Sequence, residues 1–293
     1  MKKIKPPLPF VGHKGHWASE LTEIALKLPK NCTVIDVFGG SGICSYYIKQ
    51  ARPDLAVVWN DYDNYAERLE HAEDTERLRQ RLLDLLGVPV RKGTFIPPLN
   101  DEQRAVVLNE CKRLEAQTGF VDYQTLSRWF YLYPLKAGKM HLFSGKMHNR
   151  VPVVPIRVDA CRSWLREVYR TCFCFSGLDT AIPGDCFVVH PRDFIRSQDV
   201  LFIFDPPYLG TGCNDYGNKD ALKILQSIVE CCACLPFLLF GDVSISFWYE
   251  VLFRGDPVTK YTKDINNIGM NHTKRTEVIF ARLPGEGGGR GLV

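Results

Sequence analysis

The sequence predicts an α/β fold with a doubly wound, mostly parallel sheet, and two patterns along the chain lead to this prediction. The first pattern is a set of short, continuous apolar runs, which are typical of strands covered on both faces of a parallel sheet. The second is the alternation of these runs with amphipathic helical stretches. Six runs are predicted to be strands: 33–37, 56–59, 186–190, 200–204, 236–240 and 276–281.

Apolar stripes at helical spacing mark the helices between these strands. The stripe over 17–28 lies on one face, and Pro29 then stops the helix. A second helix is predicted with Asp159 as its cap. A third is predicted over 222–232, before Pro236.

The alternation fails over residues 62–158, which we interpret as an insertion. Leucines over 69–85 predict one charged helix, and the stripe over 107–114 predicts a second with Asn100 or Asp101 as its cap. The insertion would interrupt a discontinuous catalytic domain. The predicted parts are a domain of residues 1–61 and 159–284, the inserted domain of residues 62–158, and a tail of residues 285–293.

The composition is that of an ordinary globular protein, with 45% hydrophobic and 24% charged residues and a net charge of +4. The eleven cysteines stand mostly inside apolar runs without the spacing of metal ligands. This predicts buried thiols and no metal site. The chain has neither a signal-peptide core nor an apolar stretch of membrane length, so we expect a cytoplasmic protein.

A glycine-rich turn directly follows the first predicted strand and reads Asp36-Val37-Phe38-Gly39-Gly40-Ser41-Gly42. Glycines at such a turn let the backbone approach a ligand where a Cβ atom would clash. Asp61 follows the second predicted strand, where a carboxylate can accept hydrogen bonds from ribose hydroxyls. Turn and acid together favour a cofactor that contains adenosine. The alternatives are a turn without a ligand and a solvated aspartate.

The segment Asp205-Pro206-Pro207-Tyr208 follows the apolar run 200–204. Prolines cannot continue a central strand, so the chain turns at the strand's carboxyl end, where open α/β sheets bind ligands. Asp205 and the carbonyl of Pro206 can accept the two N–H groups of an exocyclic base amine, whose nitrogen then presents a lone pair to a methyl sulfonium. Tyr208 would stack on the base after the base leaves the duplex. The alternative is a structural Pro-Pro turn with a surface acid.

These segments resemble, in kind and in order, the motifs of the Dam-type DNA adenine-N6 methyltransferases. The resemblance implies a Rossmann-like sheet with an antiparallel last strand and an inserted target-recognition domain. It also implies S-adenosyl-L-methionine as the cofactor. Because related cytosine-N4 enzymes usually carry serine at the first position of the catalytic motif, Asp205 favours adenine.

The resemblance and the turn together select the candidate site residues. The predicted catalytic residues are Asp205, Pro206, Pro207 and Tyr208. The predicted cofactor-binding residues are Phe10, Lys14, Asp36, Phe38, Gly39, Gly40, Ser41, Gly42, Asp61, Asp193, Phe194 and Asp205.

The stretch 123–158 contains basic and aromatic residues but no Asp or Glu, which is typical of phosphate binding. The expected partner is double-stranded DNA in the cytoplasm of a bacterium or a phage-infected cell. We expect a monomer, with a dimer on DNA left open. The side chains predicted to contact DNA are Arg128, Lys136, Lys139, Lys146, His148, Arg150, Lys263, Lys274 and Arg275.

Three other functions share these patterns. They are methylation of adenine N6 in RNA, methylation of cytosine N4 in DNA, and DNA binding without catalysis on the same fold. The principal hypothesis is a site-specific transfer of a methyl group from S-adenosyl-L-methionine to N6 of a flipped-out adenine in DNA. Product analysis separates the first two alternatives from this hypothesis, and an active wild type excludes the third.

Overall fold

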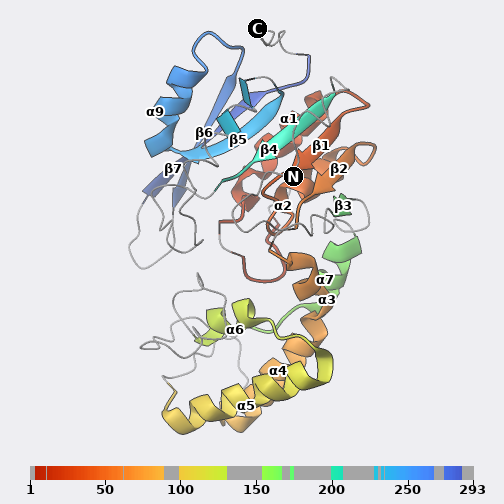
Figure 1. The fold of residues 1–293 in the computed structure, drawn as a ribbon, viewed down its shortest axis with the longest axis vertical. Helices are drawn as coiled ribbons and strands as arrows, with labels where there is room; N and C mark the ends of the chain where they lie inside the picture. Colours follow the sequence, from red (N-terminus) through yellow and green to blue (C-terminus); the bar gives the residue numbers. More distant parts are fainter. Residues whose placement is uncertain are drawn as a thin grey trace. The chain divides into compact units, whose positions relative to one another are not determined.

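The computed structural model describes residues 4–10, 12–61, 63–88, 99–130, 154–166, 172–174, 199–206, 228–229, 232–233, 235–266 and 274–285. The chain divides into two compact units (Figure 1). The sheet unit consists of residues 1–4, 14–63 and 168–293. The helical unit consists of residues 5–13 and 64–167.

Within its described residues, the sheet unit contains a seven-stranded sheet of order β3-β2-β1-β4-β5-β7-β6 (Figure 1). Neighbouring strands from β3 to β5 are parallel, and β7 is antiparallel to β5 and β6. The α/β class and the antiparallel last strand are thereby confirmed. The strands are β1 (Thr33–Asp36), β2 (Ala56–Trp59), β3 (Cys172–Cys174), β4 (Val200–Phe204), β5 (Phe237–Asp242), β6 (Thr259–Asn266) and β7 (Lys274–Arg282).

Five of the six predicted runs form strands, with small shifts at their ends. The sixth, 186–190, lies outside the described residues. The sequence patterns do not predict β3, which has only three residues, or β6, whose sequence mixes charged and polar residues. β6 lies at the edge of the sheet, where a strand needs no continuous apolar run.

Helices cover both faces of this sheet. Tyr249 of α9 (Val243–Leu252) packs on Phe280 of β7, with ring centroids 5.6 Å apart. Trp17 packs on Phe240 of β5 at 6.3 Å. Phe280 is paired with Leu239, the neighbour of Phe240, so the two aromatic contacts lie on opposite faces. The face that Trp17 covers also carries η1 (Gly15–Trp17), α1 (Ala18–Lys27) and α2 (Ile43–Ala51).

The outcome for the predicted helices of the sheet unit is mixed. The helix over 17–28 is confirmed, and its last residue Lys27 precedes Pro29. Of the predicted helix over 222–232, residues 228–229 and 232 are described, and they are helical.

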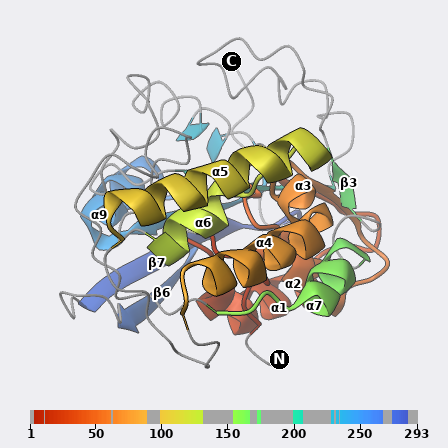
Figure 2. The ribbon, with the colours of Figure 1, turned by 90° about the horizontal axis from the view of Figure 1, so that it is seen from below.

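The described part of the helical unit contains α3 (Tyr65–Glu70), α4 (Ala72–Leu85), α5 (Asp101–Thr118), α6 (Tyr123–Phe130) and α7 (Val158–Trp164) (Figure 2). Apolar side chains of α4, α5 and α6 form its core. Leu82, Cys111 and Leu126 are almost completely buried there.

Two helix predictions need correction. The single helix expected over 69–85 is wrong, because the chain breaks at His71, which hydrogen-bonds Asp74 and stacks on Phe120. Asp159 is not the cap of α7. Arg157 is the N-cap and Asp159 lies in the first turn, where a carboxylate favours the helix dipole.

The predicted cap of α5 is confirmed as Asn100. Its side chain accepts a hydrogen bond from the backbone of Gln103 (2.8 Å), and the side chain of Gln103 accepts one from the backbone of Asn100 (3.1 Å). This reciprocal pair satisfies two backbone N–H groups at the start of the helix.

Arg68 ties the N-terminal segment into the helical unit. Its Nη2 donates to the carbonyl of Pro9 (3.0 Å), and its Nε donates to Asp122 (3.0 Å). The hydroxyl of Tyr65 and the backbone of Leu8 exchange two further hydrogen bonds (3.1 and 3.0 Å). These contacts explain why the segment belongs with the helices although it precedes the sheet in sequence.

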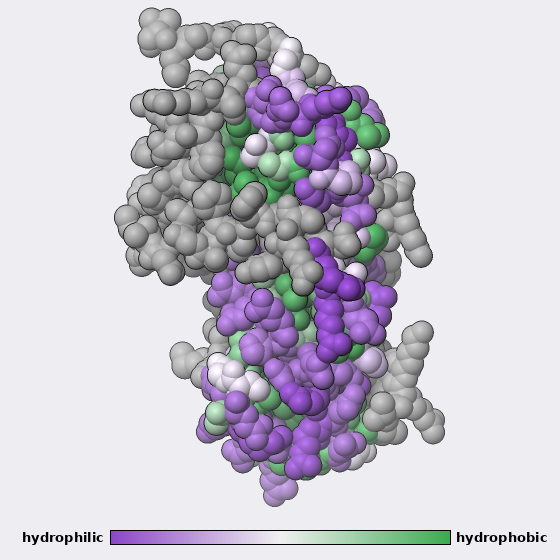
Figure 3. Space-filling view, turned by 90° about the vertical axis from the view of Figure 1, so that its right-hand side faces the viewer, coloured by the Kyte–Doolittle hydropathy of each residue, from purple (hydrophilic) through white to green (hydrophobic). Residues whose placement is uncertain are grey.

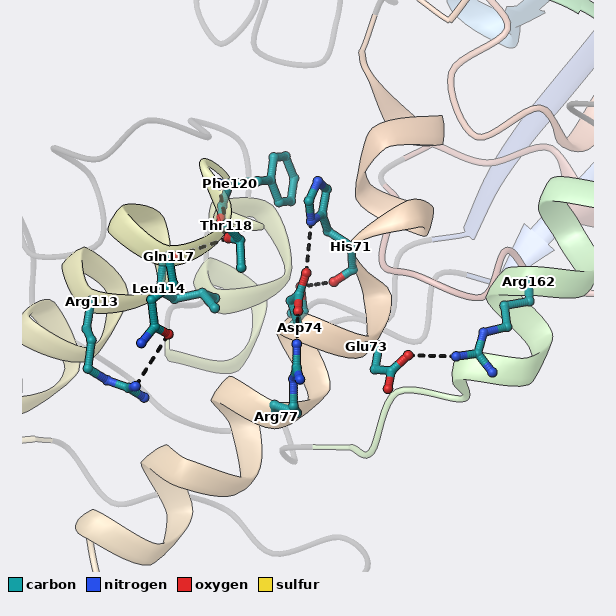
Figure 4. A network of polar contacts seen from close by, with 11 residues as sticks. His71, Glu73, Asp74, Arg77, Arg113, Leu114, Gln117, Thr118, Phe120 and Arg162 are labelled. Atoms are coloured by element: carbon teal, nitrogen blue, oxygen red, sulfur yellow. Dashed lines mark hydrogen bonds and ion pairs between the residues drawn. The ribbon is translucent and has the colours of Figure 1, made fainter.

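The helical unit is largely hydrophilic on the face shown in Figure 3. Ion pairs join neighbouring helices of this unit, as in the 2.6 Å contact between Glu73 of α4 and Arg162 of α7 (Figure 4). Exposed pairs of this kind each contribute at most about 1 kcal/mol, so the core and Arg68 dominate the stability of the unit.

Two predictions from composition can be compared with the described residues. The five described cysteine side chains are buried, free thiols, as expected: Cys32, Cys44, Cys111, Cys161 and Cys232. Among the helices that the structure describes, none combines the length and the apolar composition that crossing a membrane requires.

Candidate active site

The glycine turn after β1 has the tight geometry that its sequence predicts. Gly40 and Gly42 adopt positive φ angles of 48° and 71°, a region that favours glycine. A Cβ atom on Gly39 would lie 2.0 Å from Cδ1 of Trp59 and 2.9 Å from the carbonyl oxygen of Asn60. Only glycine fits at position 39 without displacing the end of β2.

The end of β2 is bonded to this turn. The backbone N–H of Asn60 donates to the carbonyl of Asp36 (3.1 Å), and its side-chain amide donates to the carbonyl of Val37 (2.9 Å). Asp61, the predicted ribose ligand, follows directly and is partly buried. Hydrogen bonds therefore join the two loops at the carboxyl ends of β1 and β2.

Asp36 is buried at the end of β1, with 1% of its surface exposed. Its Oδ2 accepts a hydrogen bond from the hydroxyl of Ser45 on α2 (2.8 Å), whereas Oδ1 has no hydrogen-bond partner among the described residues. Burial, together with the charge of Asp205, raises the pKa of Asp36 to about 7. A buried carboxylate oxygen without a partner is costly, which indicates a position built for a ligand.

Asp205 follows β4 and forms an ion pair with Lys14, in which Nζ lies 2.6 Å from Oδ2. Lys14 is 3% exposed, and its ammonium also lies 5.6 Å from the centre of the Phe240 ring. Burial raises the pKa of Asp205, and the charge and hydrogen bond of Lys14 oppose that rise. Lys14 therefore favours the ionised form of a carboxylate that its surroundings would otherwise neutralise.

A second carboxylate, Glu277 of β7, lies on the same face of the sheet. Its Oε2 accepts hydrogen bonds from Nε2 of His16 (2.8 Å) and from Nε1 of Trp17 (3.2 Å). Burial alone would raise its pKa, but the hydrogen bond from His16 and the charge of Lys14 outweigh burial and lower the pKa to about 2. Glu277 is thus ionised at neutral pH.

Strand geometry explains why these groups gather. Alternate residues of a strand point to the same face, so Asp205 shares the face of Leu201 and Ile203. Glu277 is paired with Asp242, which shares the face of Phe240 and therefore of Trp17. Asp36, Asp205 and Glu277 consequently lie on the face of the sheet that carries Lys14, just before η1, and His16, within η1.

The sequence did not indicate three residues of this site: His16, Trp17 and Glu277. Glu277 directly precedes a run of buried apolar residues in β7, residues 278–281. An acid in such a position is a signal that could have found it. Trp17 was expected only as a core residue. The contact between them joins positions 260 residues apart, which spacing along the chain cannot show.

Several predicted site residues lie outside the described residues or in the other unit. Phe10 belongs to the helical unit, where its ring packs edge-on against Tyr65 at 5.6 Å. The predicted residues outside the description are Pro207, Tyr208, Asp193, Phe194, Lys136, Lys139, Lys146, His148 and Arg150. Arg128 lies in α6 and Lys274 and Arg275 in β7, but their side chains are not described.

Lys263, predicted to contact DNA, is engaged inside the sheet unit. Its ammonium donates to Glu20 (2.7 Å) and to the carbonyl of His16 (2.8 Å), and it lies 5.0 Å from the centre of the Trp17 ring. The side chain remains 25% exposed. These contacts link β6 to η1 and α1.

Sequence comparison identifies the class of enzyme to which this geometry belongs. No protein-family model matches the chain. The chain is 31% identical over 256 residues to the "Putative methyltransferase" of Haemophilus influenzae, with 82% of this chain and 77% of that protein covered. Identity at this level over most of both sequences accords with the open sheet and its glycine turn. The chain therefore belongs to the family of this methyltransferase.

Proposed function

We propose that the protein transfers a methyl group from S-adenosyl-L-methionine to N6 of adenine in double-stranded DNA. The observation that carries the proposal is the Lys14–Asp205 pair at the carboxyl end of β4, beside the glycine turn and the partnerless oxygen of Asp36. A methyltransferase needs a cofactor cradle and an acceptor for the substrate amine within one site. The carboxyl end of this sheet supplies groups suited to both.

The residues around β1 fit the proposed cofactor. Gly39 lets the turn pack directly against Trp59 at the end of β2, and Asp36 offers a buried acceptor oxygen to a cationic group. Asp61 stands where ribose hydroxyls would be bound. S-adenosyl-L-methionine supplies a methyl group on a positively charged sulfur, and the carboxylates Asp36, Asp205 and Glu277 favour a cation on this face of the sheet.

Asp205 is proposed to accept an N–H group of the target amine. Lys14 holds Oδ2, which orients the carboxylate and favours its ionised form. The carbonyl of Pro206 is the second proposed acceptor. Two acceptors draw the amine nitrogen away from conjugation with the ring, so that its lone pair becomes available for transfer.

DNA as the polymer and adenine as the base rest on sequence. The acid-free stretch 123–158 supports a polyanion, and aspartate at position 205 supports adenine through the resemblance to Dam-type enzymes. RNA and cytosine N4 are the competing substrates, and they are separated by product analysis.

The test incubates the purified protein with cofactor carrying a labelled methyl group and, in parallel, with duplex DNA or structured RNA. We expect label only in N6-methyl-2′-deoxyadenosine released from DNA. Label confined to RNA or to N4-methylcytosine would overturn the substrate assignment. Asp205→Asn should give no product yet still bind DNA, which distinguishes catalysis from simple binding. Asp256→Asn, which removes a carboxylate paired with Arg282 at 2.8 Å, is the matched control and should remain active.

A further inference from the structure

We propose that Glu277 is a positioning residue of the reaction centre, which holds Lys14 against Asp205 by anchoring the two side chains that follow Lys14 in the chain. The proposal rests on the proposed function for the role of Asp205. Glu277 itself contacts His16 and Trp17, so it acts through them and through Lys14.

The first support is the position of the anchored side chains. Gly15 alone separates Lys14 from His16, and the backbone N–H of Trp17 donates to the carbonyl of Lys14 (2.9 Å). Oε2 of Glu277 accepts from both His16 and Trp17. A single carboxylate oxygen thus holds the last two residues of the short turn that begins at Lys14.

The second support is the packing around this anchor. Trp17 is completely buried and meets Phe240, whose ring also lies next to the ammonium of Lys14. Lys263, the cross-strand partner of Glu277, donates to the carbonyl of His16 (2.8 Å). Residues of β5, β6 and β7 therefore all contact the turn, and a displacement of Glu277 would change the position of Lys14.

The third support is electrostatic. Asp36 of β1, Asp205 after β4, Asp242 of β5 and Glu277 of β7 are the acids of this face, and the ammonium groups of Lys14 and Lys263 oppose their charge. The imidazole of His16 is hydrogen-bonded to Glu277. The charge of Glu277 raises the pKa of Asp205, and that of Lys14 lowers it. An anchor for Lys14 that also carries negative charge can influence both the place of the cation and the ionisation of Asp205.

The test is a mutant cycle that follows the titration of the Asp205 carboxyl by carbon-13 NMR, with Asp205→Asn to assign the signal. Lys14→Met is introduced into wild type, Glu277→Ala and Glu277→Gln. In wild type it should raise the pKa of Asp205 by roughly one pH unit or more, because a neighbouring cation is lost. In Glu277→Ala the same change should have less than about half that effect, since Lys14 is no longer held.

The conservative variant separates anchoring from charge. Glu277→Gln retains an oxygen that can accept from Trp17 but loses the negative charge. We expect it to lower the pKa of Asp205 and to preserve most of the effect of Lys14→Met. Glu250→Ala, which removes the glutamate paired with Lys260, is the matched control. It should change neither the pKa of Asp205 nor the effect of Lys14→Met on that pKa.

An effect of Lys14→Met that is equal in wild type and Glu277→Ala would overturn the proposal, whatever happens to the melting temperature. If Glu277→Ala does not fold, the double variant His16→Ala and Trp17→Phe removes the two groups that donate to Glu277. In this double variant, the effect of Lys14→Met on the pKa of Asp205 must be reduced to the same extent. The titration needs neither cofactor nor DNA. Absence of methyl transfer by the wild type would therefore refute the proposed function alone. An equal effect of Lys14→Met on the pKa of Asp205 in wild type and in Glu277→Ala would refute the role of Glu277 alone.

Discussion

Two buried clusters of charge among the described residues differ in how completely their hydrogen-bonding groups are satisfied. In the helical unit, Asp122 accepts hydrogen bonds from Arg68 and from the backbone and hydroxyl of Thr125. Arg68 also donates to Pro9 and to Gln124. In the sheet unit, Oδ1 of Asp36 has no partner among the described residues, and the pKa of Asp36 is raised to about 7.

The difference separates an architectural cluster from a functional one. A buried ion pair whose hydrogen-bonding groups are satisfied holds elements together and has little left for a ligand. A cluster in which a buried carboxylate oxygen has no hydrogen-bond partner, and in which burial raises the carboxyl pKa values, can still bind a ligand. By this criterion we assign an architectural role to the Arg68 cluster and propose the Lys14–Asp205–Asp36 cluster as the reaction centre.

The largest expected effect on stability is in the helical unit. Arg68→Met leaves the buried Asp122 without its cation and should lower the free energy of unfolding by about 3–5 kcal/mol. Arg162→Met, which removes an exposed pair with Glu73, should cost at most about 1 kcal/mol. Chemical denaturation measures both. Equal losses for the two variants would contradict the architectural role of Arg68.

The next effect concerns the glycine turn. Gly39→Ala forces a methyl group against Trp59 and should cost about 1–3 kcal/mol through overpacking. It should also weaken cofactor binding, which calorimetry measures. Gly87→Ala is the control, because a Cβ atom there meets nothing within 4 Å and only its positive φ of 64° opposes it. Unchanged cofactor affinity in Gly39→Ala would count against the turn as the cradle.

The pH dependence of stability sharpens the comparison further. The folded pKa of Asp36 is about 7 and its ordinary value is 3.8, so the folded state binds more protons between these pH values. Stability contributed by Asp36 therefore falls as pH rises from 3.8 to about 7. Glu277 has the opposite sign, with stability gained as pH rises from about 2 to 4.5. Asp36→Asn should reduce the fall at higher pH in denaturation curves, and the raised pKa of Asp205 accounts for the fall that remains. A fall as large as that of the wild type would refute the assignment to Asp36.

Much of the fold and half of the site follow from local sequence. The apolar runs that end in Asp36 and Asp205 predict both strands and the edge at which these acids meet, because a parallel sheet brings carboxyl ends together. The break at His71 was missed, since it depends on a contact with Phe120, which lies in the segment between α5 and α6. Glu277, His16 and Trp17 were missed as site residues for the same physical reason, because tertiary pairing brings them together.

The smallest expected effect concerns Lys263 and the salt dependence of DNA binding. Its ammonium already donates to Glu20 and to the carbonyl of His16, so Lys263→Met should leave the slope of log affinity against log salt unchanged. A phosphate contact, as predicted from sequence, would instead reduce the slope by about 1. Filter binding or fluorescence anisotropy across a salt series decides between them.

The most direct test of the difference between the two clusters compares Asp205→Asn with Asp122→Asn. Both remove the charge of a carboxylate that is paired with a buried cation. Methyl transfer per folded molecule and thermal melting are measured for each variant. We expect Asp205→Asn to lose transfer by at least about 100-fold while melting no lower than wild type. Asp122→Asn should melt lower yet transfer at the wild-type rate once folded. The reverse pattern, or loss of transfer in both folded variants, would contradict the assignment of catalysis to one cluster and architecture to the other.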